Sequence, residues 1–92
     1  MRIDLLLSSE ENDFHVWSRH RVAIREIEYA VYANGAVFRG REENIYMVLG
    51  RTEEGRYRTV FVRYLGGCTA RLITARDMTQ PERRRHDRHT AH

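Results

Sequence analysis

The sequence of 92 residues contains no lysine, one cysteine and one proline. A single cysteine excludes a disulfide within the chain and is typical of proteins kept in a reducing compartment. The zinc-binding spacings Cys-x-x-Cys and His-Glu-x-x-His are absent, so neither a metal nor another cofactor is predicted. The apolar run near the start, residues 3–7, is interrupted by Asp4 and is too short for a membrane span or a secretion signal. We therefore expect a soluble, cytoplasmic protein that does not associate with membranes.

All sixteen basic side chains are arginines, although a genome rich in G and C would also favour arginine codons. The guanidinium group stays charged and binds phosphate through two parallel hydrogen bonds. The charge is also uneven. Residues 1–55 contain seven arginines and ten acidic residues, whereas residues 56–92 contain nine arginines and three acidic residues. A net charge of −3 on the first part and +6 on the second indicates a surface that binds a polyanion.

The hydrophobic pattern predicts one α+β domain over residues 1–92, with a disordered tail after about residue 88. Helical spacing predicts N-terminal helices over 10–21, capped by Ser9, and over 23–33, ended by Asn34-Gly35. Alternation then predicts an antiparallel β-meander of about four strands, followed by a closing C-terminal helix that begins at Thr79. The predicted meander strands are 36–39, 44–51, 57–65 and 68–76, and a further short strand is predicted over 2–7.

Five helical residues are predicted to be core: Phe14, Trp17, Ile24, Ile27 and Val31. The dipeptide Gly66-Gly67 predicts a two-residue hairpin turn, and counting back from it places Tyr57 opposite Arg76. Directly paired residues share a face of the sheet, although a register slip of one residue would exchange the faces. The predicted core face carries Val60, Val62, Ile73 and Ala75, and the predicted polar face carries Tyr57, Thr59, Arg63, Thr74 and Arg76.

Residues 71–89, with the sequence RLITARDMTQPERRRHDRH, concentrate positive charge at the junction of a strand and a helix. The strand ends at Arg76, and Thr79-x-x-Glu82 forms a capping box for the helix that follows. That helix carries three consecutive arginines, residues 83–85, and then His86. This arrangement suits phosphate binding, with an imidazole beside the charges.

Six segments of the sequence carry a further signal: Arg19-His20, Glu26, Val48-Leu49-Gly50-Arg51-Thr52, Gly55-Arg56-Tyr57, Ile73-Thr74-Ala75-Arg76-Asp77-Met78-Thr79 and Glu82-Arg83-Arg84-Arg85. Together they resemble the motifs of the BrnT family of toxins, over about residues 13–88. The resemblance implies a fold similar to RelE-type ribonuclease toxins and a place in a type II toxin–antitoxin module. It further implies cleavage of RNA that inhibits translation, and a small antitoxin partner through which the complex binds operator DNA.

Metal-independent cleavage of RNA needs a base for the 2′-hydroxyl, an acid for the leaving 5′-oxygen and cations on the phosphate. The catalytic candidates are Arg76, Tyr57, His86 and His20. Each also has a structural interpretation. Arg76 would instead pair with Asp77 or a helix carboxylate, and Tyr57 would pack across the strands. His86 would belong to a solvated helix face, and His20 would cap the first helix.

Four further residues are predicted to bind RNA: Arg51, Arg63, Thr74 and Arg85. For the arginines the alternative is ordinary solvated charge at strand ends and on a helix. Two other functions remain open alongside the endoribonuclease. A non-enzymatic protein of the same fold would bind nucleic acid or an antitoxin with strong salt dependence but without cleavage. A protein-interaction module would have negligible affinity for nucleic acid.

Overall fold

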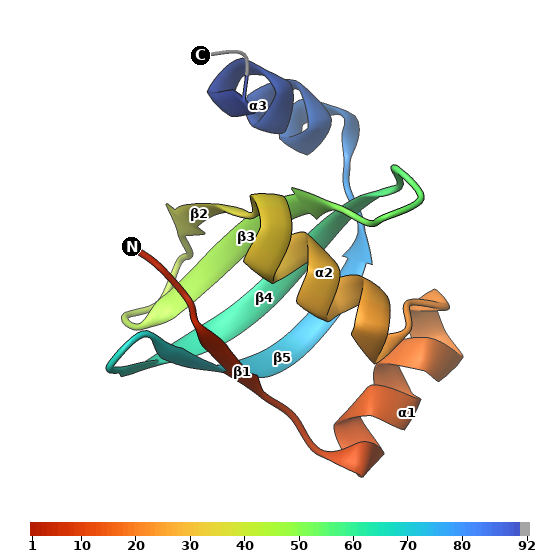
Figure 1. Ribbon diagram of the computed structural model, residues 1–92, viewed down its shortest axis with the longest axis vertical. Coiled ribbons are helices and arrows are strands. Elements are labelled where there is room, and N and C mark those ends of the chain that lie inside the picture. The colour runs from red at the N-terminus through yellow and green to blue at the C-terminus, as the bar shows by residue number, and fades with distance from the viewer. Residues whose placement is uncertain (91–92) are drawn as a thin grey trace.

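The computed structural model describes residues 1–90, apart from the side chain of Asn34. Within these residues the chain forms three helices and five strands, which confirms the predicted α+β class (Figure 1). The elements are β1 (Leu5–Leu7), α1 (Glu10–His20), α2 (Ile24–Asn34), β2 (Ala36–Arg39), β3 (Ile45–Arg51), β4 (Tyr57–Gly66), β5 (Thr69–Asp77) and α3 (Gln80–Thr90). β1 is shorter than the predicted strand 2–7, and the other helices and strands lie close to their predicted bounds.

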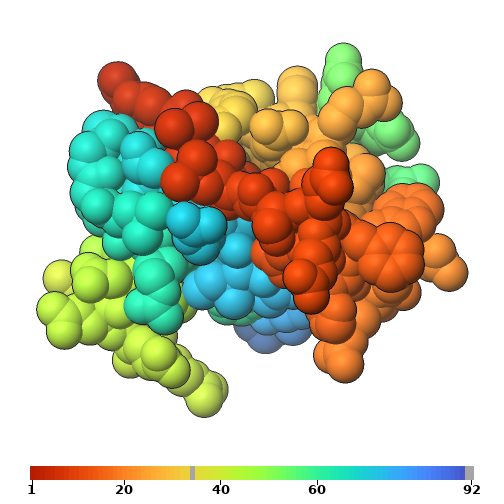
Figure 2. Space-filling model, turned by 90° about the horizontal axis from the view of Figure 1, so that it is seen from below, coloured from red at the N-terminus to blue at the C-terminus, as the bar shows by residue number. Residues whose placement is uncertain are grey.

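The strands form one sheet in the order β1-β5-β4-β3-β2. β2 to β5 are the predicted antiparallel meander, and β1 is added at the edge, parallel to β5. α2 packs against β3 and β4, and α1 packs against β5. In the view from below, α1 (orange-red) lies beside the blue strand β5 (Figure 2). α3 contacts β2 and β3 through the opposite face of the sheet, so the helices lie on both sides.

The helices begin where the sequence places capping groups. The Ser9 hydroxyl accepts a hydrogen bond from the Asn12 backbone N–H at 3.1 Å, as predicted for the start of α1. The predicted capping box of α3 is also confirmed. The Thr79 hydroxyl accepts from the Glu82 N–H at 3.3 Å, and the Glu82 carboxylate accepts from the Thr79 N–H at 2.9 Å. These bonds satisfy backbone donors that have no partner within the helix.

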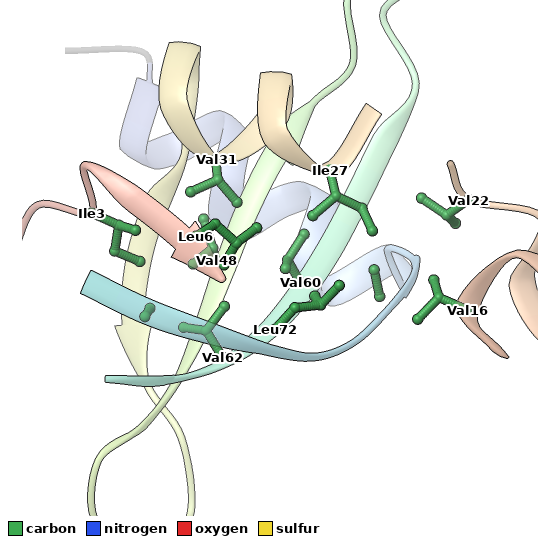
Figure 3. Close-up of a cluster of buried hydrophobic side chains, with 12 residues drawn as sticks. Ile3, Leu6, Val16, Val22, Ile27, Val31, Val48, Val60, Val62 and Leu72 are labelled. Atoms are coloured by element: carbon green, nitrogen blue, oxygen red, sulfur yellow. The ribbon is translucent and has the colours of Figure 1, made fainter. Parts of the chain in front are cut away.

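The core lies between the sheet and the two N-terminal helices (Figure 3). Ile27 and Val31 of α2 point toward Val48 and Val60 of the sheet, and all four are buried. Ile24 is partly buried beside this cluster. The predicted core role of the α2 residues is therefore confirmed.

The prediction that Phe14 and Trp17 are core residues is wrong. Phe14 is 70% exposed and Trp17 is 46% exposed. The residue that α1 buries is Val16, and the Asn12 side chain donates a hydrogen bond to the Leu72 carbonyl at 3.0 Å. Asn12 and Val16 are four positions apart and so share the side of α1 that faces the sheet, whereas Phe14 and Trp17 are rotated away from it.

The hairpin turn between β4 and β5 is displaced by one residue from its predicted position. Gly67 and Cys68 occupy its central positions, with φ of +59° and +58°, and Gly66 pairs with Thr69. Two central residues with positive φ are characteristic of a type I′ turn. Cys68 therefore takes a conformation that we had expected a glycine to take.

A β-bulge changes the pairing further along this hairpin. Ile73 is an extra residue in β5, and it is 40% exposed rather than part of the core as predicted. The predicted pair of Tyr57 and Arg76 is also wrong: Tyr57 pairs with Arg51, and Arg76 pairs with Thr59. The membership of the polar face survives these shifts. Tyr57, Thr59, Arg63, Thr74 and Arg76 share the side of the sheet that faces α3, while Val60, Val62 and Ala75 belong to the core as predicted.

The C-terminal helix is longer than expected. α3 continues to Thr90, beyond residue 88, where we expected order to end. The rest of the expected tail, residues 91 and 92, lies outside the described residues. None of the helices within residues 1–90 combines the length and apolar character needed to cross a membrane.

Candidate nucleic-acid interface

Tyr57, the first residue of β4, joins the sheet to α3. Its ring lies edge-on to the His86 imidazole, with 5.6 Å between centroids and an interplanar angle of 86°. The Arg83 guanidinium lies 4.2 Å from the ring centroid, and that of Arg51 lies 5.0 Å from it. The Tyr57 hydroxyl donates a hydrogen bond to the Asp87 carboxylate at 3.2 Å. Side chains of β3 and α3, which are far apart in the sequence, therefore meet around Tyr57.

Beside Tyr57 is an open hollow of about 560 Å³, here called the Tyr57 hollow. Its walls come from the end of α1, the start of β4, the end of β5 and the first turns of α3. The lining residues are His20, Arg21, Arg56, Tyr57, Arg58, Asp77, Met78 and Arg83. Two predicted catalytic residues, His20 and Tyr57, are thus brought to the same hollow.

Arginine dominates the charge of the Tyr57 hollow. Four arginines line it against one acidic residue, Asp77. Arg58 is buried and its charge is compensated, because it pairs with Glu26 at 3.3 Å and with Asp77. Arg56 is exposed, with Glu54 at 4.0 Å. The other two guanidiniums, those of Arg21 and Arg83, lie on the Trp17 and Tyr57 rings, and neither forms an ion pair with a carboxylate within residues 1–90. The excess of arginine gives the hollow a positive potential suited to phosphate.

His20 is exposed and is the last residue of α1. Arg21 follows in the left-handed conformation, with φ of +55°, and its N–H donates to the Trp17 carbonyl at 2.8 Å. This left-handed cap ends the helix and turns the chain toward α2. His20 is therefore an exposed residue in the lining of the Tyr57 hollow.

Arg76 does not line the Tyr57 hollow. Its guanidinium forms a bidentate ion pair with Glu82, at 2.8 and 3.0 Å, which is the structural alternative stated for it. Glu82 also accepts from the Thr59 hydroxyl at 2.7 Å. The hydrogen bonds from Arg76 lower the pKa of Glu82 to about 2, against the opposing effect of burial, and Glu82 raises the pKa of Arg76. A phosphate would have to displace this carboxylate to reach Arg76.

His86 is buried, at 3% exposure, so it does not belong to a solvated helix face. Its Nδ1 lies 3.4 Å from the Asp87 carboxylate, and its Nε2 is buried without a hydrogen-bond partner. It lines a second hollow of about 340 Å³, together with Tyr29 and Arg51. The two predicted catalytic histidines therefore line different hollows.

The predicted RNA-binding residues are spread over the face toward α3. Arg51 contacts the Tyr57 ring, and the Arg85 guanidinium lies 3.9 Å from the centroid of Phe38 in β2. Thr74 pairs with Phe61 at the middle of the face. Arg63 is six positions from Tyr57 along β4, a separation on the order of 20 Å.

Three arginines that line the Tyr57 hollow, Arg21, Arg56 and Arg83, are not among the site residues predicted from the sequence. Arg56 adjoins Tyr57 in the chain, and Arg83 begins the arginine run, so both carried a signal. Arg21 carried none beyond its charge, because its position depends on where α1 ends. Among the described residues, no three or more histidine, cysteine, aspartate or glutamate side chains are grouped so that they could hold a metal ion.

The fold is a small α+β domain, in which helices flank a mainly antiparallel sheet and the closing helix is basic. It is similar to the crystal structure of the Brucella abortus ribonuclease toxin BrnT, with a TM-score of 0.66 over 83% of this chain and 99% of that chain. The two sequences are 15% identical, so the likeness establishes the fold, and the predicted resemblance to BrnT is confirmed at that level. No protein-family model and no curated protein matches the sequence.

Proposed function

We propose that this protein is the toxin of a type II toxin–antitoxin module, a metal-independent endoribonuclease that inhibits translation in the cytoplasm. The Tyr57 hollow carries the proposal, because it combines an accessible imidazole, a phenol and several arginines. The fold supports it, since the similar Brucella protein is a ribonuclease toxin. The partners would be RNA and a cognate antitoxin that covers the basic surface, with operator DNA bound only through the complex of the two proteins.

The proposed reaction needs no group from outside the chain. His20 accepts the proton of the RNA 2′-hydroxyl, and the 2′-oxygen forms a bond to the adjacent phosphorus. The bond from phosphorus to the 5′-oxygen breaks, and the Tyr57 hydroxyl protonates that oxygen. The products are a 2′,3′-cyclic phosphate and a 5′-hydroxyl. Arg56 and Arg83 contact the phosphate oxygens, where negative charge increases in the transition state.

The other predicted site residues take supporting roles in this proposal. His86 packs against the Tyr57 ring and orients it. Arg76 ties α3 to the sheet through Glu82. Arg51, Thr74 and Arg85 extend the RNA-binding surface over the face toward α3, whereas Arg63 would contact RNA only at the far end of the sheet.

The test is incubation of the purified protein with RNA in the presence of EDTA, followed by analysis of the product ends. We expect cleavage to 2′,3′-cyclic phosphate and 5′-hydroxyl termini. Exchanging His20→Ala should reduce the cleavage rate by about 10²-fold or more, since general base catalysis typically contributes 10²- to 10⁴-fold. His15→Ala, which changes an exposed histidine of α1 outside the hollow, is the matched control. Intact RNA at every protein concentration, together with harmless expression in cells, would refute the proposal.

One observation favours a second function, a non-enzymatic binder of nucleic acid or antitoxin. The predicted phosphate clamp Arg76 is fully engaged by Glu82, and the Tyr57 hydroxyl is engaged by Asp87. Such a protein would bind RNA with strong salt dependence and yield no products. The same incubation distinguishes the two functions when binding is measured beside cleavage.

A further inference from the structure

α1 carries two exposed aromatic side chains that the core does not use. Phe14 is 70% exposed and Trp17 is 46% exposed. They lie three positions apart, so they occupy one side of the helix, rotated away from the buried Val16. Aromatic rings on a surface are common sites of recognition, because they offer a large apolar contact at little cost in conformational entropy.

Arg21 joins these rings to the Tyr57 hollow. Its guanidinium lies 5.6 Å from the Trp17 ring centroid, and Arg21 also lines the hollow. We call Phe14, Trp17 and Arg21 the Trp17 platform. The platform begins at the hollow and extends along the outer side of α1, so a chain-like ligand that enters the hollow can continue across it.

The charge around the platform is graded along α1. Residues 19–21, directly after Trp17, are Arg, His and Arg. The opposite end of the helix carries Glu10, Glu11 and Asp13 in its first turn. A polyanionic ligand is therefore attracted to the Trp17 end and repelled from the far end.

The size of the platform favours a nucleic acid over a protein partner. Phe14 and Trp17 are the exposed apolar side chains of α1, all of whose residues are described. An aromatic side chain contributes about 150–250 Å², whereas a stable protein–protein interface buries about 800 Å² on each side. Two rings beside a guanidinium match one or two nucleobases, each of which stacks on an aromatic ring.

We propose that the Trp17 platform is a base-stacking subsite for single-stranded RNA, which binds a nucleotide next to the phosphate held in the Tyr57 hollow. This inference rests on the proposed function, because it takes RNA as the ligand of the hollow. It adds a source of affinity and of sequence preference outside the cleavage chemistry. Stacking would be tolerant of the base, with larger purines favoured over pyrimidines.

Trp17 is the one tryptophan of the sequence, so its fluorescence reports directly on the subsite. The probe is a 2′-O-methyl oligoribonucleotide of about eight nucleotides, which the proposed reaction cannot cleave because its 2′-oxygen carries no proton. We expect titration with this probe to quench the fluorescence of the full chain. In parallel, anisotropy of a dye-labelled probe should show that Trp17→Ala weakens binding about 5- to 100-fold, which corresponds to the loss of one stacked base. Trp17→Phe should retain most of the affinity.

The matched control is Leu65→Ala, because Leu65 is 47% exposed and lies on the β4–β5 hairpin, away from α1. Its affinity should equal that of the parent protein. Unchanged fluorescence and full affinity of Trp17→Ala, in a protein that cleaves RNA, would overturn the subsite and leave the proposed function standing. A fluorescence change produced by a purified antitoxin and not by the probe would overturn it in favour of a protein partner. Failure both to bind and to cleave RNA would overturn the two proposals together.

Discussion

The two faces of the sheet hold their helices by different interactions. The face toward α2 is mainly aliphatic, with Val48, Val60 and Val62 completely buried, and it also holds one buried ion pair, between Arg58 of β4 and Glu26 of α2. The face toward α3 is held by guanidinium groups on aromatic rings, such as Arg83 on Tyr57, and by the ion pair of Arg76 with Glu82. One face thus excludes water, whereas the other keeps positive charges at the surface.

This difference separates stability from ligand binding. Burial of aliphatic side chains stabilises the fold without regard to pH or salt near neutrality. Contacts between arginines and aromatic rings stabilise less per residue, and they leave N–H groups available to an anion. We infer that the α3 face contributes less to stability than the α2 face but carries most of the ligand chemistry.

The largest effect is expected in the α2 face. Ile27→Ala removes a side chain that is 1% exposed, and should lower the free energy of unfolding by about 2–5 kcal/mol. The matched control is Ile73→Ala, which removes the same atoms from the exposed bulge of β5 and should cost less than about 1 kcal/mol. Urea unfolding followed by circular dichroism measures both values. An equal loss of unfolding free energy in the two variants would contradict the exposed position of Ile73 in the bulge of β5.

The next effect is a pH dependence located in the α3 face. The pKa of Glu82 in the folded protein is about 2, below its ordinary value of 4.5, so the unfolded chain binds the proton more tightly. The ion pair therefore contributes stability above pH 4.5, and this contribution is lost as the pH falls from 4.5 toward 2. At about 1.4 kcal/mol for each pH unit, this difference in pKa corresponds to about 3.4 kcal/mol, and screening of the partly exposed pair by water reduces the expected contribution to about 2–3 kcal/mol at neutral pH.

Glu82→Gln removes the carboxylate but keeps the size of the side chain. Its unfolding free energy should lie below that of the parent at pH 7, and the difference should shrink as the pH falls toward 2. Glu53→Gln, at an exposed position in the β3–β4 turn, is the control and should show no such convergence. A constant difference across this range would show that Glu82 stabilises the helix through its shape rather than its charge.

Local signals in the sequence predicted much of the fold. The Ser9 cap, the Thr79 capping box and the alternation of the strands act between residues close in the chain, and the structure confirms them. Helical spacing also placed Phe14 and Trp17 on one side of α1 correctly. It could not show that this side faces water, because the orientation of α1 depends on Val16 and on the distant Leu72 carbonyl.

The candidate site was less predictable because it depends on long-range pairing. Counting from the predicted turn could not reveal that the turn lies one residue later in the chain, which moves the partner of Arg76 by two residues, from Tyr57 to Thr59. The extra residues in β4 and β5, Leu65 and Ile73, shift the pairing in opposite directions and offset one another. The Glu82 carboxylate accepts hydrogen bonds both from the Thr79 N–H of the cap and from Arg76. The capping motif in the sequence indicates only the first of these bonds. Charge and residue type identified Tyr57 and His20, but only the tertiary fold brings them together.

Removal of the Tyr57 hydroxyl tests whether the α3 face contributes more to activity than to stability, because we expect it to lower RNA cleavage and to change the free energy of unfolding very little. Tyr57→Phe keeps the ring contacts with α3 and removes the proposed acid, so RNA cleavage should fall about 10²-fold or more. Tyr46→Phe removes the hydroxyl of another partly buried tyrosine, one that packs against the core on the α2 side, and should cleave at the parental rate. Cleavage rates are compared at saturating RNA, after unfolding curves have shown that both variants are folded. Parental activity of Tyr57→Phe would remove the phenol from the mechanism.

The smallest effect concerns individual phosphate contacts within the α3 face. Arg83 lines the Tyr57 hollow, whereas Arg63 shares the same face of the sheet about six residues away along β4. For single-stranded RNA, each phosphate neutralised contributes about 0.7 to the slope of log affinity against log salt. Arg83→Gln should therefore reduce the magnitude of that slope by roughly 0.7 and weaken binding a few-fold. If a short oligonucleotide occupies only the hollow and the Trp17 platform, Arg63→Gln should change neither the slope nor the affinity. Anisotropy titrations of the same 2′-O-methyl probe at several salt concentrations measure both slopes. If the two variants reduce the salt dependence equally, the RNA lies along the whole face toward α3, and the hollow is one of several equivalent contacts.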